Sequence, residues 1–330
     1  MAGRELDGSS VGELTVGVDV GGTKIQSVVV RSESIVGQHR LETPQTGADD
    51  VAAAIVEAAT KALAEADAEP SDVRAAGIGV PGAIDTDAGT VSSSPNLPGF
   101  QDAEPVPLGE MVSAGLGRAP VMLDNDVRVG ILGEWKRGAG RGYRNLMGVW
   151  VGTGVGGGLV LDGELFQGRG AAGEIGHTIV KPGGRICSDG RFGHLEAYAG
   201  RAQMEAEARR RVKKGHKTDL FDIMKKKGRT RLSSGVWASA LEHHDKMARD
   251  LVDDAVEALA TGLASVQNLL ALEAIVIGGG LGDRLGTPFV ERIEKGMKPL
   301  LFVPDAAPRM LTTEFGDLSG AVGASVLAGG

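Results

Sequence analysis

One local pattern occurs twice in this chain, and it constrains the fold more than any other feature. The pattern is a strand, a tight turn of glycine and threonine, and a second strand. Its first copy is centred on Gly21-Gly22-Thr23-Lys24 and its second, about 130 residues later, on Gly152-Thr153-Gly154. Two such hairpins in a chain of 330 residues, which is long enough to bury two cores, predict two domains with a similar plan.

Strands and helices are expected to alternate around both hairpins. Apolar runs predict strands at 14–20, 25–30, 35–41, 73–80, 121–123, 145–151, 155–161 and 273–277. Helical periodicity predicts helices at 51–64, from Asp124 or Asn125 to about Arg137, and at 196–212, 247–270 and 318–327. This alternation indicates the α/β class. We expect a small domain at 1–123, with the C-terminal helix within 318–330 packing back on it, and a large domain at 124–317.

Composition excludes several classes of protein. There are 35 Lys and Arg against 43 Asp and Glu, a net charge of −8, so neither nucleic acid nor an anionic membrane is an expected partner. No apolar run approaches the roughly 20 residues that span a bilayer, and no signal peptide is recognised. Cys187 is the single cysteine, which excludes an internal disulfide. A cytoplasmic protein is therefore expected.

The first hairpin has the composition of a phosphate-binding turn. A tight glycine turn exposes backbone N–H groups that bind phosphate oxygens, and Thr23 adds a hydroxyl. Asp19, at the end of the preceding strand, is suited to a hydrated Mg²⁺ ion. The sequence is equally compatible with an ordinary β-hairpin.

Two further glycine motifs extend this interpretation to a nucleotide. The second hairpin lacks the Gly-Lys-Ser/Thr of a Walker loop, and a strand follows it where a Rossmann fingerprint needs a helix. Together the two hairpins predict a polyphosphate held between the domains. Gly278-Gly279-Gly280 follows a buried strand, where a flat adenine could lie on the backbone. The alternative for this last motif is a plain strand-to-helix turn.

Polar groups for the chemistry occur in two places. In Asp124-Asn125-Asp126, a carboxylate can accept the proton of an attacking alcohol and Asn125 can bind a sugar hydroxyl, or these residues can simply cap a helix. The second place is the glycine-rich stretch from Gly173 to Glu196, whose carboxylates and imidazoles suit vicinal hydroxyls. A surface loop that hydrogen-bonds its own backbone is the alternative there.

These motifs, in this order, resemble the ROK family of bacterial sugar kinases and sugar-responsive repressors. The resemblance also includes 95–99 (Pro-Asn-Leu-Pro-Gly) and Asn268-Leu-Leu, and it spans the chain from Asp19 to the last helix. It implies the two-domain actin-like (ribonuclease-H-like) ATPase fold with an interdomain cleft. It implies Asp126 as the catalytic base. The sugar contacts that it implies are Asn96, Asn125, Glu174, His177 and Glu196.

The resemblance also predicts a nucleotide site, and it departs from the family at a metal site. The nucleotide residues are expected to be Asp19, Gly21, Gly22, Thr23, Lys24, Thr153, Gly154, Gly279 and Gly280. The family's zinc site uses a histidine and three cysteines, but here Asp189 and His194 replace two of the cysteines at unchanged spacing. His177, Cys187, Asp189 and His194 are all possible zinc ligands, and the alternative is a metal-free, hydrogen-bonded loop.

The function expected from this resemblance is phosphorylation of a hexose at its 6-hydroxyl by ATP and Mg²⁺, with glucose as the first candidate, in a cytoplasmic homodimer of carbohydrate metabolism. Fructose, mannose or N-acetylmannosamine are alternative substrates. A sugar-sensing regulator is a further alternative, although only about 13 residues precede the first strand, too few for a helix-turn-helix domain. A non-catalytic interaction protein is a third alternative, disfavoured by the polar sugar residues.

Overall fold

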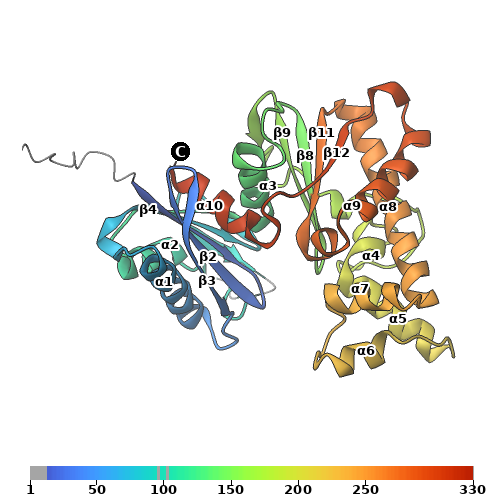
Figure 1. Cartoon of the computed structure of the whole chain (residues 1–330), viewed down its shortest axis with the longest axis horizontal. Coiled ribbons are helices and arrows are strands. Elements are labelled where there is room, and N and C mark those ends of the chain that lie inside the picture. Colours follow the sequence, from blue (N-terminus) through green and yellow to red (C-terminus); the bar gives the residue numbers. More distant parts are fainter. Residues whose placement is uncertain (1–12, 95–96, 102–103, 330) are drawn as a thin grey trace, which may run out of the picture. The chain divides into compact units, whose positions relative to one another are not determined.

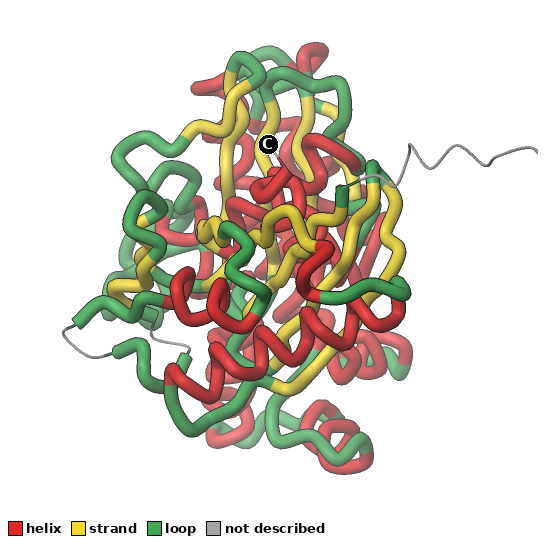
Figure 2. Tube along the Cα trace, turned by 90° about the vertical axis from the view of Figure 1, so that its left-hand side faces the viewer, coloured by secondary structure: helices red, strands yellow, loops and turns green. Residues whose placement is uncertain are grey.

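The computed structural model describes residues 13–94, 97–101 and 104–329 (Figure 1). The chain forms two compact units, residues 1–133 with 320–330 and residues 134–319. It passes between them within α3 (Asp126–Arg137) and at the start of α10 (Ser319–Gly329). The division therefore lies inside α3, whereas the sequence places a boundary before that helix. Figure 2 shows the helices in red and the strands in yellow along the Cα trace.

The first unit is built on a five-stranded mixed sheet with the strand order β3-β2-β1-β4-β7. β3 pairs with β2 and β2 with β1 in antiparallel fashion, whereas β1 pairs with β4 and β4 with β7 in parallel fashion. A separate hairpin pairs β5 with β6. The bounds are β1 Leu14–Val20, β2 Lys24–Arg31, β3 Ser34–Glu42, β4 Val73–Val80, β5 Ala83–Asp85, β6 Thr90–Ser93 and β7 Val121–Asn125.

Helices cover both faces of this sheet. On one face, α1 (Ala48–Glu65) and α2 (Leu108–Gly115) share an apolar core with the valines of β1. On the other face, α10 approaches so closely that a Cβ on Gly77 would lie 1.8 Å from the carbonyl oxygen of Ala324. Gly17 meets the same helix, which explains why α10 consists mainly of small residues.

The second unit repeats the plan of the first. Its five-stranded sheet has the order β10-β9-β8-β11-β12, with β10, β9 and β8 antiparallel and β8, β11 and β12 parallel. The duplication predicted from the two hairpins is thus confirmed, as is the α/β class. The strand bounds are β8 Leu146–Val151, β9 Val155–Leu161, β10 Glu164–Phe166, β11 Ala274–Gly278 and β12 Arg309–Thr312.

Six helices of the second unit lie between β10 and β12 in the described chain. They are α4 Glu196–Ala199, α5 Arg201–Lys213, α6 Leu220–Lys226, α7 Ser234–Glu242, α8 Lys246–Leu270 and α9 Gly279–Met297. α9 packs on the sheet and α8 packs on α9, enclosing a core that includes the fully buried Trp237 (Figure 1). None of the described helices is long and apolar enough to cross a membrane.

The prediction of a single helix at 196–212 is wrong, because the helix is interrupted at Gly200. The backbone of Gly200 is extended there, with φ −69° and ψ 126°. Its lack of a side chain lets the turn between β8 and β9 come close, since a Cβ on Gly200 would lie 3.3 Å from the Cα atom of Gly154. The break therefore brings the start of α5 directly to the second glycine hairpin.

Candidate functional site

The first glycine hairpin is held from behind by residues that follow β3. The Gly21 N–H closes the turn by donating to the Lys24 carbonyl oxygen at 2.8 Å. The Thr43 hydroxyl donates to the Gly21 carbonyl at 2.6 Å, and the Gln45 amide donates to the Gly22 carbonyl at 3.2 Å. Two successive carbonyl groups of the turn are therefore already bound on one side.

The hydrogen bonds from Thr43 and Gln45 orient the N–H groups of the turn. In a trans peptide the C=O and the following N–H point in opposite directions, so the N–H groups of Gly22 and Thr23 point away from Thr43 and Gln45. Neither donates to an acceptor among the described residues. Gly22 and Thr23 thus present two adjacent donors, the arrangement that binds anions, whereas the Gly21 N–H is used within the turn.

The second hairpin reaches the same arrangement with different partners. The Gly152 N–H closes the turn on the Gly154 carbonyl at 2.9 Å. The first N–H groups of α5, those of Arg201 and Ala202, donate to the Gly152 and Thr153 carbonyls at 3.1 and 3.0 Å. By the same trans-peptide geometry, the N–H groups of Thr153 and Gly154 point away from α5, and neither has an acceptor in the described chain.

The predicted Mg²⁺ and adenine residues have defined packing roles. Asp19 is the last residue but one of β1, and its carboxylate lies against Gly320, where a Cβ would lie 2.5 Å from the Asp19 Cγ. Gly279 has φ +80° and begins α9, and a Cβ there would lie 2.7 Å from the Val151 backbone nitrogen. Gly280 faces the Ser234 hydroxyl. Glycine at 279 is thus required by the strand-to-helix turn itself.

The three polar residues between β7 and α3 divide their roles. Asp124 is buried, and it binds the Arg128 side chain and the Asn125 N–H through one oxygen. Asn125 ends β7, and its side-chain oxygen accepts from Val127 N at 3.0 Å and Arg128 N at 3.4 Å, which makes it the cap of α3. Its NH₂ group donates to no acceptor among the described residues, and an amide NH₂ offers two donors. Asp126 is the first helical residue and is only partly buried.

The predicted sugar residues of the second unit lie around the loop before α4. Glu174 and His177 are exposed, at the two ends of the short turn that contains Ile175 and Gly176. Glu196 starts α4, and its two oxygens accept from the Val155 N–H at 2.9 Å and the Ser188 hydroxyl at 3.0 Å. Glu196 therefore joins this loop to the second hairpin. Asn96 lies outside the described residues.

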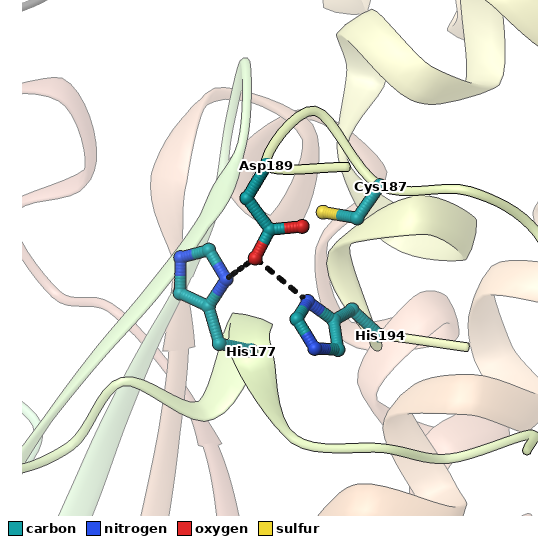
Figure 3. A group of neighbouring side chains, drawn as sticks. All are labelled: His177, Cys187, Asp189 and His194. Atoms are coloured by element: carbon teal, nitrogen blue, oxygen red, sulfur yellow. Dashed lines mark ion pairs between the residues drawn. The ribbon is translucent and has the colours of Figure 1, made fainter. Parts of the chain in front are cut away.

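The four predicted metal ligands come together in one group (Figure 3). One ligand atom from each of His177, Cys187, Asp189 and His194 lies within 4.8 Å of the others. The Asp189 carboxylate is central, 3.3 Å from the His177 Nδ1 atom and 3.2 Å from the His194 Nδ1 atom. Two imidazoles, a carboxylate and a thiol form a donor set that transition metals accept.

Two of these groups have displaced pKa values. A hydrogen bond from the Arg191 backbone, together with the Arg191 side chain and both imidazoles, lowers the pKa of Asp189 to about 2. Burial raises the pKa of the Cys187 thiol. The carboxylate is therefore ionised at neutral pH, whereas the thiol holds its proton unless a bound cation displaces it.

Several residues that form this site carry no recognisable signal in the sequence. Thr43, Gln45 and Arg201 lie 20 or more residues away from the glycine turns that they contact. A threonine, a glutamine or an arginine outside a motif is indistinguishable from any surface residue. Only the folded sheet shows that these side chains orient the two hairpins.

Comparison with known proteins places the chain among characterised relatives. The model of the ROK family matches residues 15–330. The chain is 32% identical to a glucokinase of Streptomyces coelicolor over 320 residues, covering 96% of this chain and 97% of the relative. It is 34% identical to a glucokinase of Halalkalibacterium halodurans over 315 residues, covering 93% and 92%.

A solved structure agrees with these relatives. The ROK family glucokinase of Streptomyces griseus, determined in complex with glucose and AMPPNP, superposes with a TM-score of 0.78 at 31% identity, covering 96% of this chain and 99% of that one. The two units with their repeated mixed sheets are therefore those of the two-domain actin-like ATPase fold. A family match over nearly the whole chain and two relatives above 30% identity lead to one conclusion: the chain is a member of the ROK family.

Proposed function

We propose that this chain is a glucokinase, which transfers the γ-phosphoryl group of ATP to the 6-hydroxyl of glucose. The observation that carries the proposal is the likeness to glucokinases over nearly the full length of both chains. The two hairpins with their outward N–H groups supply what a nucleotide polyphosphate needs. A phosphotransferase acting on a small sugar also fits the net charge of −8, which does not favour polyanionic macromolecules.

The nucleotide is assigned to the glycine motifs. The N–H groups of Gly22 and Thr23, and those of Thr153 and Gly154, donate to phosphate oxygens. Lys24 adds a positive charge beside the first hairpin, and the segment at Gly279 and Gly280 accommodates the adenine. Asp19, near the end of β1, would hold the hydrated Mg²⁺ that accompanies ATP. When bound, this ion neutralises charge on the phosphates of ATP.

The sugar and the proton transfer are assigned to polar residues of both units. Asn96, the NH₂ group of Asn125, Glu174, His177 and Glu196 bind the hydroxyls of the hexose. Asp126 accepts the proton of the 6-hydroxyl while that oxygen forms a bond to the γ-phosphorus. The bond from phosphorus to the bridging oxygen breaks at the same time, and ADP leaves with the electron pair.

The direct test is phosphorylation of glucose by ATP, followed through ADP release with and without sugar. Glucose-dependent turnover is expected, with lower kcat/KM for fructose, mannose and N-acetylmannosamine. ATP turnover that no sugar stimulates would contradict the proposal and favour a sugar-sensing regulator. We also propose a homodimer located in the cytoplasm, and the mass of the native protein in solution tests the first of these.

Substitution of Gly22 by valine is expected to raise the KM for ATP about ten- to a hundredfold. A branched side chain covers the two outward N–H groups, and each hydrogen bond to a charged phosphate is worth about 1.5–3 kcal/mol. The KM for glucose, measured in the same assay, serves as the internal control and should change little. If only the glucose KM moved, the first hairpin would not be the phosphate site.

We further infer that His177, Cys187, Asp189 and His194 hold one zinc ion, which fixes the loop before α4. The ion would have a structural role. It would hold His177 in place within the loop that carries the sugar residue Glu174 and leads to Glu196. Metal bound through one ring nitrogen fixes the tautomer of His177, so that the other N–H can donate to a sugar hydroxyl.

Elemental analysis of protein purified without a histidine tag is expected to find zinc, and chelation should raise the glucose KM more than the ATP KM. Cys187→Ala should lose the metal, whereas Lys181→Gln, an exposed change in the same loop but outside the ligand set, should keep it. Protein without zinc, with unchanged glucose affinity in Cys187→Ala, would show that hydrogen bonds alone hold the loop.

A further inference from the structure

Arg201 contacts the second glycine hairpin through both its backbone and its side chain. It is the first residue of α5, and its N–H donates to the Gly152 carbonyl at 3.1 Å. Its guanidinium reaches back to the same turn, where Nη2 donates to the Thr153 hydroxyl oxygen at 3.1 Å. The side chain is therefore folded over the turn on which the nucleotide phosphates are placed.

The contact with Arg201 determines what the Thr153 hydroxyl can do. A guanidinium has five N–H donors and no acceptor, so the hydroxyl must receive the hydrogen bond through a lone pair. The hydroxyl proton cannot point at Arg201 and remains available to an acceptor elsewhere. Together with the N–H groups of Thr153 and Gly154, it completes a set of three donors at the turn.

The charge around Arg201 also favours an anion. The guanidinium forms no ion pair with a carboxylate of the described chain, and its Nε atom is buried without a hydrogen-bond partner there. Glu205, the acidic side chain that interacts with Arg201 by charge, is occupied by Arg209, Arg231 and the Leu232 N–H. Burial, and then repulsion by Arg231, lowers the pKa of Arg201. A charged group that is partly desolvated and unpaired is stabilised by an incoming anion.

We propose that Arg201 is a positioning residue for the nucleotide: it fixes the Thr153 hydroxyl as a donor to the phosphates of ATP. This inference rests on the proposed glucokinase function and adds to it a residue that belongs to none of the glycine motifs. The effect should be confined to the phosphate part of ATP, because Arg201 binds the turn and forms no hydrogen bond with a predicted sugar residue among the described ones.

Arg201→Gln in the full chain is expected to weaken AMPPNP binding about ten- to a hundredfold in titration calorimetry, the effect of losing a charge-assisted hydrogen bond. The Kd for glucose and the Ki of adenosine, which has no phosphate, should change less than about twofold. Arg210→Gln removes the same charge from the same helix, but Arg210 binds Glu207 and forms a hydrogen bond with neither Thr153 nor Glu205, so this variant should bind AMPPNP as the parent chain does.

The pathway through Thr153 is tested by a double-mutant cycle. Thr153→Val should weaken AMPPNP binding to a similar degree and Thr153→Ser should preserve it, because only serine keeps the hydroxyl. Arg201→Gln combined with Thr153→Val should lose clearly less affinity than the sum of the two single losses, since the two changes remove one shared interaction. Arg201→Lys, which retains the charge and a donor, should recover most of the lost affinity and guards against a folding defect in Arg201→Gln.

Three outcomes would overturn the assignment: unchanged AMPPNP affinity in Arg201→Gln, additive losses in the double variant, or an equal loss of glucose affinity. Failure of the proposed function would look different. In that case the parent chain itself would show no ATP turnover stimulated by glucose, whatever the Arg201 variants do to AMPPNP binding.

Discussion

Asp126→Asn is expected to lower kcat for glucose phosphorylation about 10²- to 10⁴-fold, the usual contribution of a general base. Asparagine has the shape of aspartate and keeps an oxygen for the Val127 N–H, so α3 should still begin at this residue. Only the ability to accept a proton is lost. The Kd for glucose and the KM for ATP should therefore stay within a few-fold of those of the parent chain.

Asp124→Asn is a matched control, two residues earlier and within β7. Asp124 is buried in an ion pair with Arg128, so its substitution should lower thermal stability but leave most of kcat in the folded fraction. The two variants thus separate a structural carboxylate from a catalytic one. A kcat for Asp126→Asn close to that of the parent chain would remove Asp126 from the catalytic role.

The repeated hairpins allowed much of the fold to be predicted from the sequence. A glycine-threonine turn between two apolar runs is a local signal, since both strands and the turn lie within about 20 residues. It predicts the central antiparallel pair of each sheet, β1 with β2 and β8 with β9, but not the order of the remaining strands. Parallel partners such as β4 and β11 are short buried strands, which apolar runs also predict.

Contacts between distant segments could not be predicted. The helix predicted from residue 196 onward is interrupted at Gly200, where the turn at Gly154 comes close to the backbone. The hydrophobic periodicity of residues 196–212 cannot predict this contact, because Gly154 lies in another part of the sequence. The donors behind the first hairpin, Thr43 and Gln45, are likewise placed by the pairing of β2 with β3. The resemblance to the ROK family's zinc loop predicts the four side chains around Asp189 as ligands; they lie together in the fold, and their binding of a metal stays a prediction.

Glu134, a buried carboxylate outside the sequence motifs, links the two points at which the chain passes from one unit to the other. Glu134 is fully buried in α3, next to the first crossing, and Ser319 lies at the second. One oxygen of Glu134 accepts from the Phe315 N–H at 3.0 Å and the Ser319 hydroxyl at 2.6 Å. The other accepts from the Glu314 and Ala139 N–H groups, both near 3 Å.

Glu134→Gln is therefore expected to lower the free energy of unfolding by about 3 kcal/mol, although it changes neither volume nor shape. Whichever oxygen becomes NH₂, at least one buried N–H then faces another donor, and each such unsatisfied group costs about 1–3 kcal/mol. Urea unfolding measures the loss, and Ser319→Ala, which removes one donor and leaves the carboxylate bound by three others, should cost only about 1 kcal/mol. Equal stability of Glu134→Gln and the parent chain would mean that the segment from 314 to 319 is held by its apolar contacts. A loss of stability of this size would show that the Glu134 side chain fixes α3 to the connection before α10. These are the two points at which the chain passes from one unit to the other.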